Sequence, residues 1–221
     1  MARIKPLAKP KWERKAEERP EALFHAALDV FSRRGYRAAR LEDVAQAAGV
    51  SKGTVYNYFE NKEDLLRKAL EYKFEVLFGL TENAVDSFQG TAAEKLRFFM
   101  ERGWERGLTE EVGRFHKMVL GEIAVELPGI FKLWAGKGLL RTWKLAEKII
   151  KEGQASGEFR PEADAAGIAR FATAGLSYQA LLQQHLGVNK LDPYPMAGIV
   201  VCATDIVIRG LLNGKPRGRK K

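Results

Sequence analysis

Residues 48–66 read AGVSKGTVYNYFENKEDLL and place a tight turn between two short helical segments. Apolar residues recur at helical spacing on both sides of this turn: Leu41, Val44, Ala45 and Ala48 before it, Val55 and Phe59 after it. Gly49 breaks the first segment, and Ser51 is a suitable N-cap for the second because its hydroxyl can accept from first-turn amides. This arrangement is a helix-turn-helix, whose second helix enters the major groove in DNA-binding versions.

The second of these helices has an outward side, opposite Val55 and Phe59, that is rich in hydrogen-bonding groups. It carries Lys52, Thr54, Tyr56 and Asn57, with Tyr58 beside them. Lys52 and Asn57 are the candidates for reading bases, since lysine suits guanine acceptors and asparagine suits adenine. Two alternatives remain open here: the tyrosines could pack against neighbouring helices, and Asn57 could be a solvated position.

The environment of this helix also favours contact with the sugar–phosphate backbone. Gly53 has no side chain, so the start of the helix can approach a phosphate closely. Lys62 lies at the start of the next helix and adds a cation there. Asn61 is the expected cap of that next helix, with Asp64 at its third position.

The rest of the chain is expected to be helical, which makes the fold class all-α. Helical periodicity begins after Pro20 and continues to about residue 87; further runs cover about 92–106, 110–126, 130–152, 163–186 and 194–212. No stretch alternates apolar and polar residues, so no sheet is predicted. The expected organisation is a flexible basic arm (1–19), a helix-turn-helix DNA-binding domain (20–66), a ligand-binding and dimerisation domain (67–214) and a basic tail (215–221).

Charge is concentrated at the two ends of the 221-residue chain, whose net charge is +9. Residues 1–72 hold fifteen Lys or Arg against eleven acids, residues 73–214 are neutral, and the tail adds five positive charges. Basic ends favour a polyanionic partner, nucleic acid first and anionic membrane second. A solubilising tail is the alternative for GKPRGRKK.

Targeting signals and disulfides are not predicted. The first twelve residues lack an apolar core of a signal peptide, and the longest apolar run (196–203) is much shorter than the roughly 20 residues that a bilayer requires. The single Cys202 excludes an internal disulfide and is expected to be a small core residue. These observations together indicate a cytoplasmic protein.

Three segments together, AALDVFSRRGY (26–36), DVAQAAGVSKGTVYNYF (43–59) and NKEDLL (61–66), resemble the N-terminal domain of the TetR family of bacterial transcriptional regulators. The resemblance covers about residues 22–70, roughly a quarter of the chain. It implies an all-helical homodimer in which each subunit has a three-helix DNA-binding head, completed by the start of a fourth helix. It also implies a larger helical body that binds a small molecule.

Carried over by position, the resemblance implies that Thr54, Tyr56, Tyr58 and Lys62 contact DNA, the last three mainly at phosphates. Ser51, Lys52, Gly53 and Asn57 belong to the same surface. One departure from the family is Ala39-Arg40, where a Thr-Thr pair is usual. A hydroxyl cap is lost there, at a cost of about 1 kcal/mol. Arg40 could replace a phosphate contact with a charged one, or it could point into solvent.

The resemblance also implies an effector pocket among the large apolar side chains of the body. The candidates are Trp104, Phe115, Met118, Trp134 and Tyr178, which would favour an apolar or aromatic ligand. The alternative is that these residues form core, as aromatics at helical spacing usually do. The last two helices carry small residues on broad apolar faces, including Ala172, Gly175 and Ala203, and are expected to form a two-fold four-helix dimer interface.

The predicted function is therefore a ligand-released, homodimeric repressor that binds a palindromic double-stranded DNA operator. Two recognition helices must then reach successive major grooves roughly 34–36 Å apart or a multiple of that. An enzyme is the first alternative, but the chain has three His, one Cys and no metal-ligand or phosphate-loop spacing. No catalytic residue, cofactor or metal is predicted. A membrane-surface or protein-binding module that uses the basic ends is the second alternative.

Overall fold

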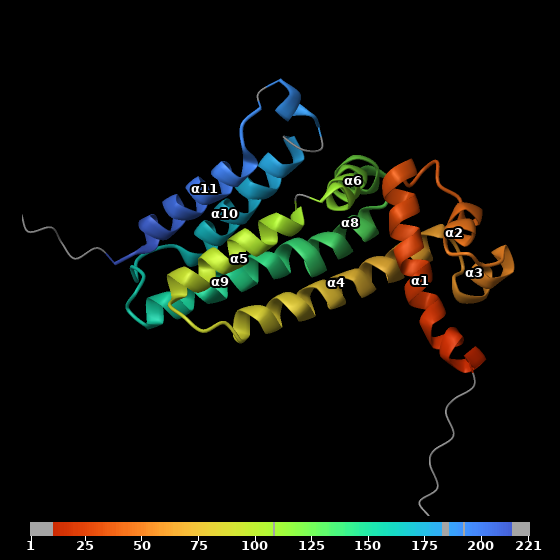
Figure 1. The fold of residues 1–221 in the computed structure, drawn as a ribbon, viewed down its shortest axis with the longest axis horizontal. Coiled ribbons are helices and arrows are strands. Elements are labelled where there is room, and N and C mark those ends of the chain that lie inside the picture. Colours follow the sequence, from red (N-terminus) through yellow and green to blue (C-terminus); the bar gives the residue numbers. More distant parts are fainter. Residues whose placement is uncertain (1–10, 108, 183–185, 192, 214–221) are drawn as a thin grey trace, which may run out of the picture. The chain divides into compact units, whose positions relative to one another are not determined.

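The structure, a computed structural model, describes residues 11–107, 109–182, 186–191 and 193–213 (Figure 1). Across these ranges the regular structure is helical, apart from one isolated antiparallel bridge between Phe159 and Leu212. The all-α prediction is confirmed. The described chain divides into two compact units between Lys73 and Phe74. The functional limits predicted at 20–66 and 67–214 stay predictions, and the tail 215–221 lies outside the described residues.

The first unit contains α1 (Lys11–Arg34), α2 (Leu41–Ala47), α3 (Lys52–Tyr58) and the beginning of α4 (Lys62–Asp86). Its core consists of side chains that these four helices turn inward, among them Leu23, Phe31, Val44, Val55, Phe59, Leu65 and Leu70. Burial of these apolar groups is what holds such short helices in place, because helices of seven residues are not stable alone.

α1 begins earlier than the sequence indicated. The flexible arm was predicted to reach residue 19, whereas α1 starts at Lys11 and continues through Pro20. Proline removes one intrahelical hydrogen bond, but the surrounding Glu, Lys, Arg and Ala are good helix formers. Residues 11–19, predicted as part of the arm, are thus helical, and residues 1–10 lie outside the described ranges.

The helix ends in the first unit lie at glycines and at capping side chains. Gly35 and Gly49 have φ values of 82° and 66°, a left-handed conformation that glycine adopts without steric cost. Ser51 Oγ accepts from the Thr54 amide at 3.1 Å, and Asn61 Oδ1 accepts from the Asp64 amide at 2.8 Å. The predicted caps of α3 and α4 are confirmed.

Within the described residues, the second unit contains the rest of α4 and seven further α-helices. They are α5 (Ala92–Gly107), α6 (Glu110–Met118), α7 (Ala124–Glu126), α8 (Pro128–Trp134), α9 (Leu140–Ala155), α10 (Ala165–Ala180) and α11 (Met196–Leu211). α5 packs against α9 and α11, and α10 packs against the same two helices (Figure 1). Their shared core includes Leu96, Ile149, Phe159, Ala169 and Leu211.

Two π-helical turns interrupt segments that were predicted as continuous helices. They span Val119–Ile123 and Ala135–Leu139. The second turn brings Gly138 against the Phe74 ring of α4, where an added Cβ would lie 3.0 Å from a ring carbon. Periodicity alone does not reveal such a turn, because it inserts a single residue into an otherwise regular helix.

A connection between α9 and α10, which we call the junction loop (residues 156–164), ties four helices together. Phe159 is fully buried in the core. The Glu158 carboxylate accepts from the Ala92 and Ala93 amides at 2.7 and 3.0 Å, which caps α5. Arg160 Nε donates at 2.9 Å to the Gly210 carbonyl at the end of α11. The loop therefore satisfies helix ends that would otherwise lack partners.

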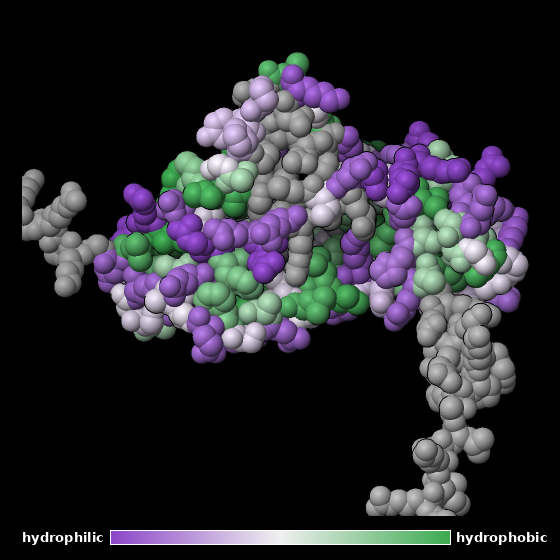
Figure 2. Space-filling view, viewed as in Figure 1, coloured by the Kyte–Doolittle hydropathy of each residue, from purple (hydrophilic) through white to green (hydrophobic). Residues whose placement is uncertain are grey.

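The outer faces of α10 and α11 expose apolar side chains. Figure 2 shows apolar surface (green) along α11, and Val201 and Ile206 are 51% and 64% exposed there. Cys202 is exposed too, so the prediction that it belongs to the core is wrong. It lies two residues, about 200° of helical rotation, from the buried Val200. Within the described ranges, no helix combines the length and apolar character needed to cross a bilayer.

Candidate nucleic-acid interface

The turn between α2 and α3 fixes the crossing of these two helices. Beyond the left-handed Gly49, the Val50 amide donates to the Ala45 carbonyl at 3.0 Å and closes the turn. Val55 is fully buried and Phe59 is 3% exposed, so these two side chains pack α3 against the other helices of the first unit. The inward face of α3 is the one that the sequence predicted.

The opposite face of α3 is open to solvent. Lys52, Gly53 and Asn57 are exposed, and Tyr56 is 48% exposed. An added Cβ at Gly53 would meet no atom closer than Ser51 Oγ at 3.8 Å, so the surface there is open. A short helix that buries only Val55 of its seven residues and exposes polar groups is suited to contact another molecule.

Lys52 has an intramolecular partner that the sequence did not suggest. Its Nζ forms an ion pair with the Glu42 carboxylate of α2 and lies 5.5 Å from the centroid of the Tyr56 ring. The hydrogen bond to Lys52 lowers the pKa of Glu42, and the same bond raises the pKa of Lys52. Glu42 precedes Lys52 by ten residues across a turn, so no rule of helical spacing joins the two.

Two other predicted contact residues take part in the cap of α3. The hydroxyls of Ser51 and Thr54 lie 2.9 Å apart and share a hydrogen bond, in addition to the bond that caps the helix. Thr54 is half-buried as a result of its position beside this cap. Tyr58 is also half-buried, with its ring centroid 6.2 Å from that of Phe59.

Arg40 occupies the N-cap position of α2 and makes no side-chain cap bond. The Asp43 carboxylate instead accepts from the Arg40 amide at 2.9 Å, and Arg34 donates to the same carboxylate group at 2.9 Å. The loss of a capping hydroxyl is therefore offset in part by Asp43 at the third helical position. Arg40 itself is exposed.

Lys62, predicted to bind phosphate, is engaged with the α1–α2 loop in this structure. Its Nζ donates to the carbonyls of Tyr36 at 2.6 Å, Ala39 at 3.0 Å and Arg37 at 3.3 Å. It also lies 4.3 Å from the centroid of the Tyr36 ring. The predicted phosphate contact competes with these bonds.

Comparison with known proteins identifies the first unit. Residues 23–69 match the family model of the bacterial regulatory proteins of the tetR family. The first unit therefore carries a TetR-family domain. The match covers the helix-turn-helix and the start of α4, the same part of the chain that carries the exposed face of α3.

The TetR-family relatives align with larger parts of the chain. The repressor KstR2 of Mycolicibacterium smegmatis is 26% identical over 69% of this chain and 73% of its own length. The repressor KstR of the same organism is 33% identical over 52% of this chain and 59% of its own length. The regulator AcrR of Shigella flexneri is 31% identical over 52% of this chain and 57% of its own length. These relatives are regulators of transcription and not enzymes.

Solved structures of other regulators share the fold over nearly the whole chain. The regulator FadR of Bacillus subtilis, in complex with stearoyl-CoA, has a TM-score of 0.69 and 21% identity over 86% of this chain and 97% of its own. A regulator from Saccharomonospora viridis, in complex with choline, has a TM-score of 0.73 and 20% identity over 90% of this chain and all of its own. At this identity the likeness shows the fold alone.

The residues predicted to line an effector pocket differ in how far they are buried. Phe115, Met118 and Trp134 are buried together with aromatic neighbours: His116 and Trp134 have ring centroids 6.2 Å apart. Tyr178 is 59% exposed on α10. The side chain of Trp104 lies outside the described residues. The burial of the first three fits core packing as well as a ligand site.

A cavity of about 190 Å³ lies between α4 and α5 within the second unit. It is lined by Thr81, Ala84, Val85, Phe98, Phe99 and Arg102. The Arg102 guanidinium lies 5.7 Å from the Phe98 ring centroid, so one rim of an apolar hollow carries a cation. None of these residues was singled out as a ligand contact from the sequence, where the aromatics gave no sign of which face they occupy.

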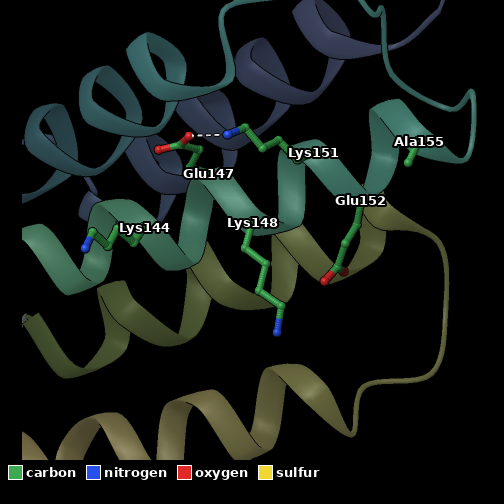
Figure 3. A pocket seen from close by; sticks show the side chains of 6 residues that line it. All are labelled: Lys144, Glu147, Lys148, Lys151, Glu152 and Ala155. Carbon is green, nitrogen blue, oxygen red and sulfur yellow. Dashed lines mark ion pairs between the residues drawn. The ribbon is translucent and has the colours of Figure 1, made fainter.

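A second hollow lies on α9 and is lined by charged side chains (Figure 3). Its residues are Lys144, Glu147, Lys148, Lys151, Glu152 and Ala155, all from one helix. Lys151 pairs with Glu147 at 2.6 Å, and Lys148 pairs with Asp86 at 2.7 Å. Most of its charges are thus paired within the chain, so this hollow suits an apolar effector poorly. In the described part of the chain, no group of three His, Cys, Asp or Glu is arranged to hold a metal ion.

Proposed function

We propose that this chain is a sequence-specific transcriptional repressor that acts in the cytoplasm as a homodimer and is released from its operator by a small molecule. The observation that carries the proposal is the outward face of α3. Its polar side chains are exposed while Val55 and Phe59 hold the helix in place. The sequence match of residues 23–69 to the TetR family supports this use of α3.

The proposed DNA contacts divide into base reading and backbone positioning. Lys52, Thr54 and Asn57 are proposed to read base edges, and Tyr56 and Tyr58 to contact phosphates. Ser51, Gly53 and Arg40 are proposed to approach the sugar–phosphate backbone. Lys52 must release Glu42 in order to contact DNA. Because this ion pair is exposed, breaking it costs little free energy.

The proposed dimer interface uses the apolar stripes of α10 and α11. On α10, Phe171, Ala174, Gly175 and Tyr178 are exposed at spacings of three and four residues, one face of the helix. Phe171 is 75% exposed, and so large an exposed apolar side chain favours a contact with another molecule. Ala172 belongs instead to the core of its own subunit, so the contribution proposed for it from the sequence falls to its neighbours.

The proposed effector is a small molecule with an apolar or aromatic part. The cavity between α4 and α5 supports this class, because aromatic rings and one cation line it. The related folds of two regulators in complex with stearoyl-CoA and choline support the proposal of a small-molecule effector. α4 starts in the first unit and ends in the second, so a ligand that shifts α4 would change the DNA affinity.

The test is selection of duplexes from a random-sequence library by the wild-type protein, followed by affinity measurements on the enriched duplex. A repressor of this kind enriches a palindrome, and its affinity falls steeply between about 50 and about 200 mM salt because several phosphates are neutralised. The matched control is Lys144→Gln, an exposed lysine on α9, which leaves affinity unchanged. Failure to enrich any sequence, or affinity that is insensitive to salt, would contradict the proposal.

A further inference from the structure

The ammonium group of Lys62 is saturated by its own chain. A lysine ammonium has three N–H donors and no acceptor. The three carbonyls of Tyr36, Arg37 and Ala39 all lie within hydrogen-bond distance of Lys62 Nζ. A phosphate could bind to this group only by displacing one of these carbonyls or by sharing a donor with it.

The three carbonyls belong to the loop that carries the chain from α1 into α2. Gly35 reverses the chain just after α1 ends at Arg34, and the residues that follow turn their carbonyls towards one point. Tyr36 and Ala39 are 9% and 2% exposed, so water has little access to this part of the loop. Converging carbonyl oxygens without donors would repel one another and lack hydrogen bonds.

The aromatic ring of Tyr36 adds a second attraction for the same cation. Lys62 Nζ lies 4.3 Å from the ring centroid, within the range of a cation–π interaction. Lys62 is half-buried as a result. Both interactions use the compact shape of an ammonium group, which a planar guanidinium does not reproduce.

We propose that Lys62 is a positioning residue that fixes the start of α4 to the α1–α2 loop, and that it is not a phosphate ligand. This inference rests on the proposed function, because it assigns a role within the DNA-binding unit. Lys62 is the first residue of α4. A change in the position of the α4 start is thereby passed to the loop that leads into α2.

The test combines thermal unfolding with the salt dependence of DNA binding, on the full chain and the duplex enriched by the wild-type protein. The variants are Lys62→Met and Lys62→Arg, with Lys144→Met as the matched control on the exposed side of α9. Lys62→Met is expected to lower Tm by about 5 °C or more, because three carbonyls lose their donor. Lys62→Arg is expected to lower Tm as well, and Lys144→Met to leave it unchanged.

The salt dependence separates the two roles of Lys62. As a positioning residue, Lys62→Met weakens DNA binding by the same factor at every salt concentration, so the slope of log affinity against log salt stays at the wild-type value. As a phosphate ligand, it would reduce that slope by about 0.9 per bound subunit. A reduced slope overturns the proposal, and so does a Lys62→Met protein with wild-type Tm.

Lys62→Arg keeps the proposal testable if Lys62→Met does not fold. Arginine binds phosphate at least as well as lysine, so a phosphate ligand would tolerate the change with wild-type Tm and affinity. That result would contradict the positioning role. If the wild-type protein enriches no duplex, the proposed function fails, while the Tm comparison of the three variants still decides whether Lys62 holds the loop.

Discussion

The outward face of α3 and the junction loop at residues 156–164 both carry charged and polar side chains, but these side chains have opposite surroundings. In the junction loop, the Glu158 carboxylate and the Arg160 guanidinium both end on backbone groups of other helices. On α3, Asn57 and Tyr56 extend into solvent. A polar side chain bonded to the backbone of its own chain supports the fold, whereas a polar side chain left in solvent can bind another molecule. Residues of the loop should govern stability, and residues of α3 should govern binding.

The largest expected effect is at Gly153, where α9 meets the ring of Phe159. An added Cβ would overlap a carbon of this ring, and because the ring is fully buried the surrounding core would have to shift to admit the methyl group. Gly153→Ala is expected to reduce the free energy of unfolding by about 3 kcal/mol. Urea unfolding measures this, with Gly103→Ala on α5 as the control. Among the described residues, no atom outside the backbone of α5 and the two chain neighbours lies within 4 Å of the Cβ added at Gly103, so that change should stabilise the helix slightly.

On the recognition face, Asn57→Ala is expected to weaken binding to the enriched duplex by about 2 kcal/mol per half-site, since a bidentate contact to adenine is lost. Its free energy of unfolding should stay within about 0.5 kcal/mol of wild type, because Asn57 is exposed. Fluorescence anisotropy and urea unfolding together give both quantities. Equal losses in binding and stability would remove the distinction between the two regions.

Glu158→Gln should cost about 1 kcal/mol of stability. The neutral amide can still accept one hydrogen bond, but it loses the charge that favours the N-terminus of α5 and one of the two bonds to the Ala92 and Ala93 amides. Glu162→Gln is the control in the same loop, because its ion pair with Arg160 is long and exposed. DNA affinity measured under folding conditions should be the same for both variants.

The smallest expected effect is on the decrease in the free energy of unfolding at acidic pH. The hydrogen bonds from Arg141 hold the pKa of Glu82 below its ordinary value, so this carboxylate stabilises the folded state above the unfolded-state pKa of about 4.5. That contribution is lost as the pH falls through the lower folded-state pKa. Glu82→Gln should therefore flatten the fall in stability below about pH 4.5, by less than about 1 kcal/mol because the pair is partly exposed. A set of unfolding curves between neutral and acidic pH measures the difference. The same pH dependence of the free energy of unfolding in wild type and variant would contradict the prediction.

The local features of the first unit could be predicted from sequence, because they depend on neighbours within four residues. The caps at Ser51 and Asn61, the turns at Gly35 and Gly49 and the inward face of α3 are of this kind. The partners of Lys62 and Lys52 could not be predicted, since they lie 23–26 and ten residues away along the chain. Burial of Phe115, Met118 and Trp134 was open in the sequence for a related reason. A helical stripe shows which residues share a face, but it does not show what that face meets.

The π-helical turn at Ala135–Leu139 determines which residues of α9 meet α4. One added residue rotates everything that follows it in a helix by about 100°. With the present register, Gly138 faces Phe74, and Arg141 reaches Glu82 with two bonds of 2.8 and 2.9 Å. Deletion of a single residue from this turn would leave the composition of α9 nearly unchanged but direct Arg141 about a quarter of a turn away from Glu82. The contact of α4 with α9 thus depends on the number of residues in the turn before α9 as well as on the side chains that meet.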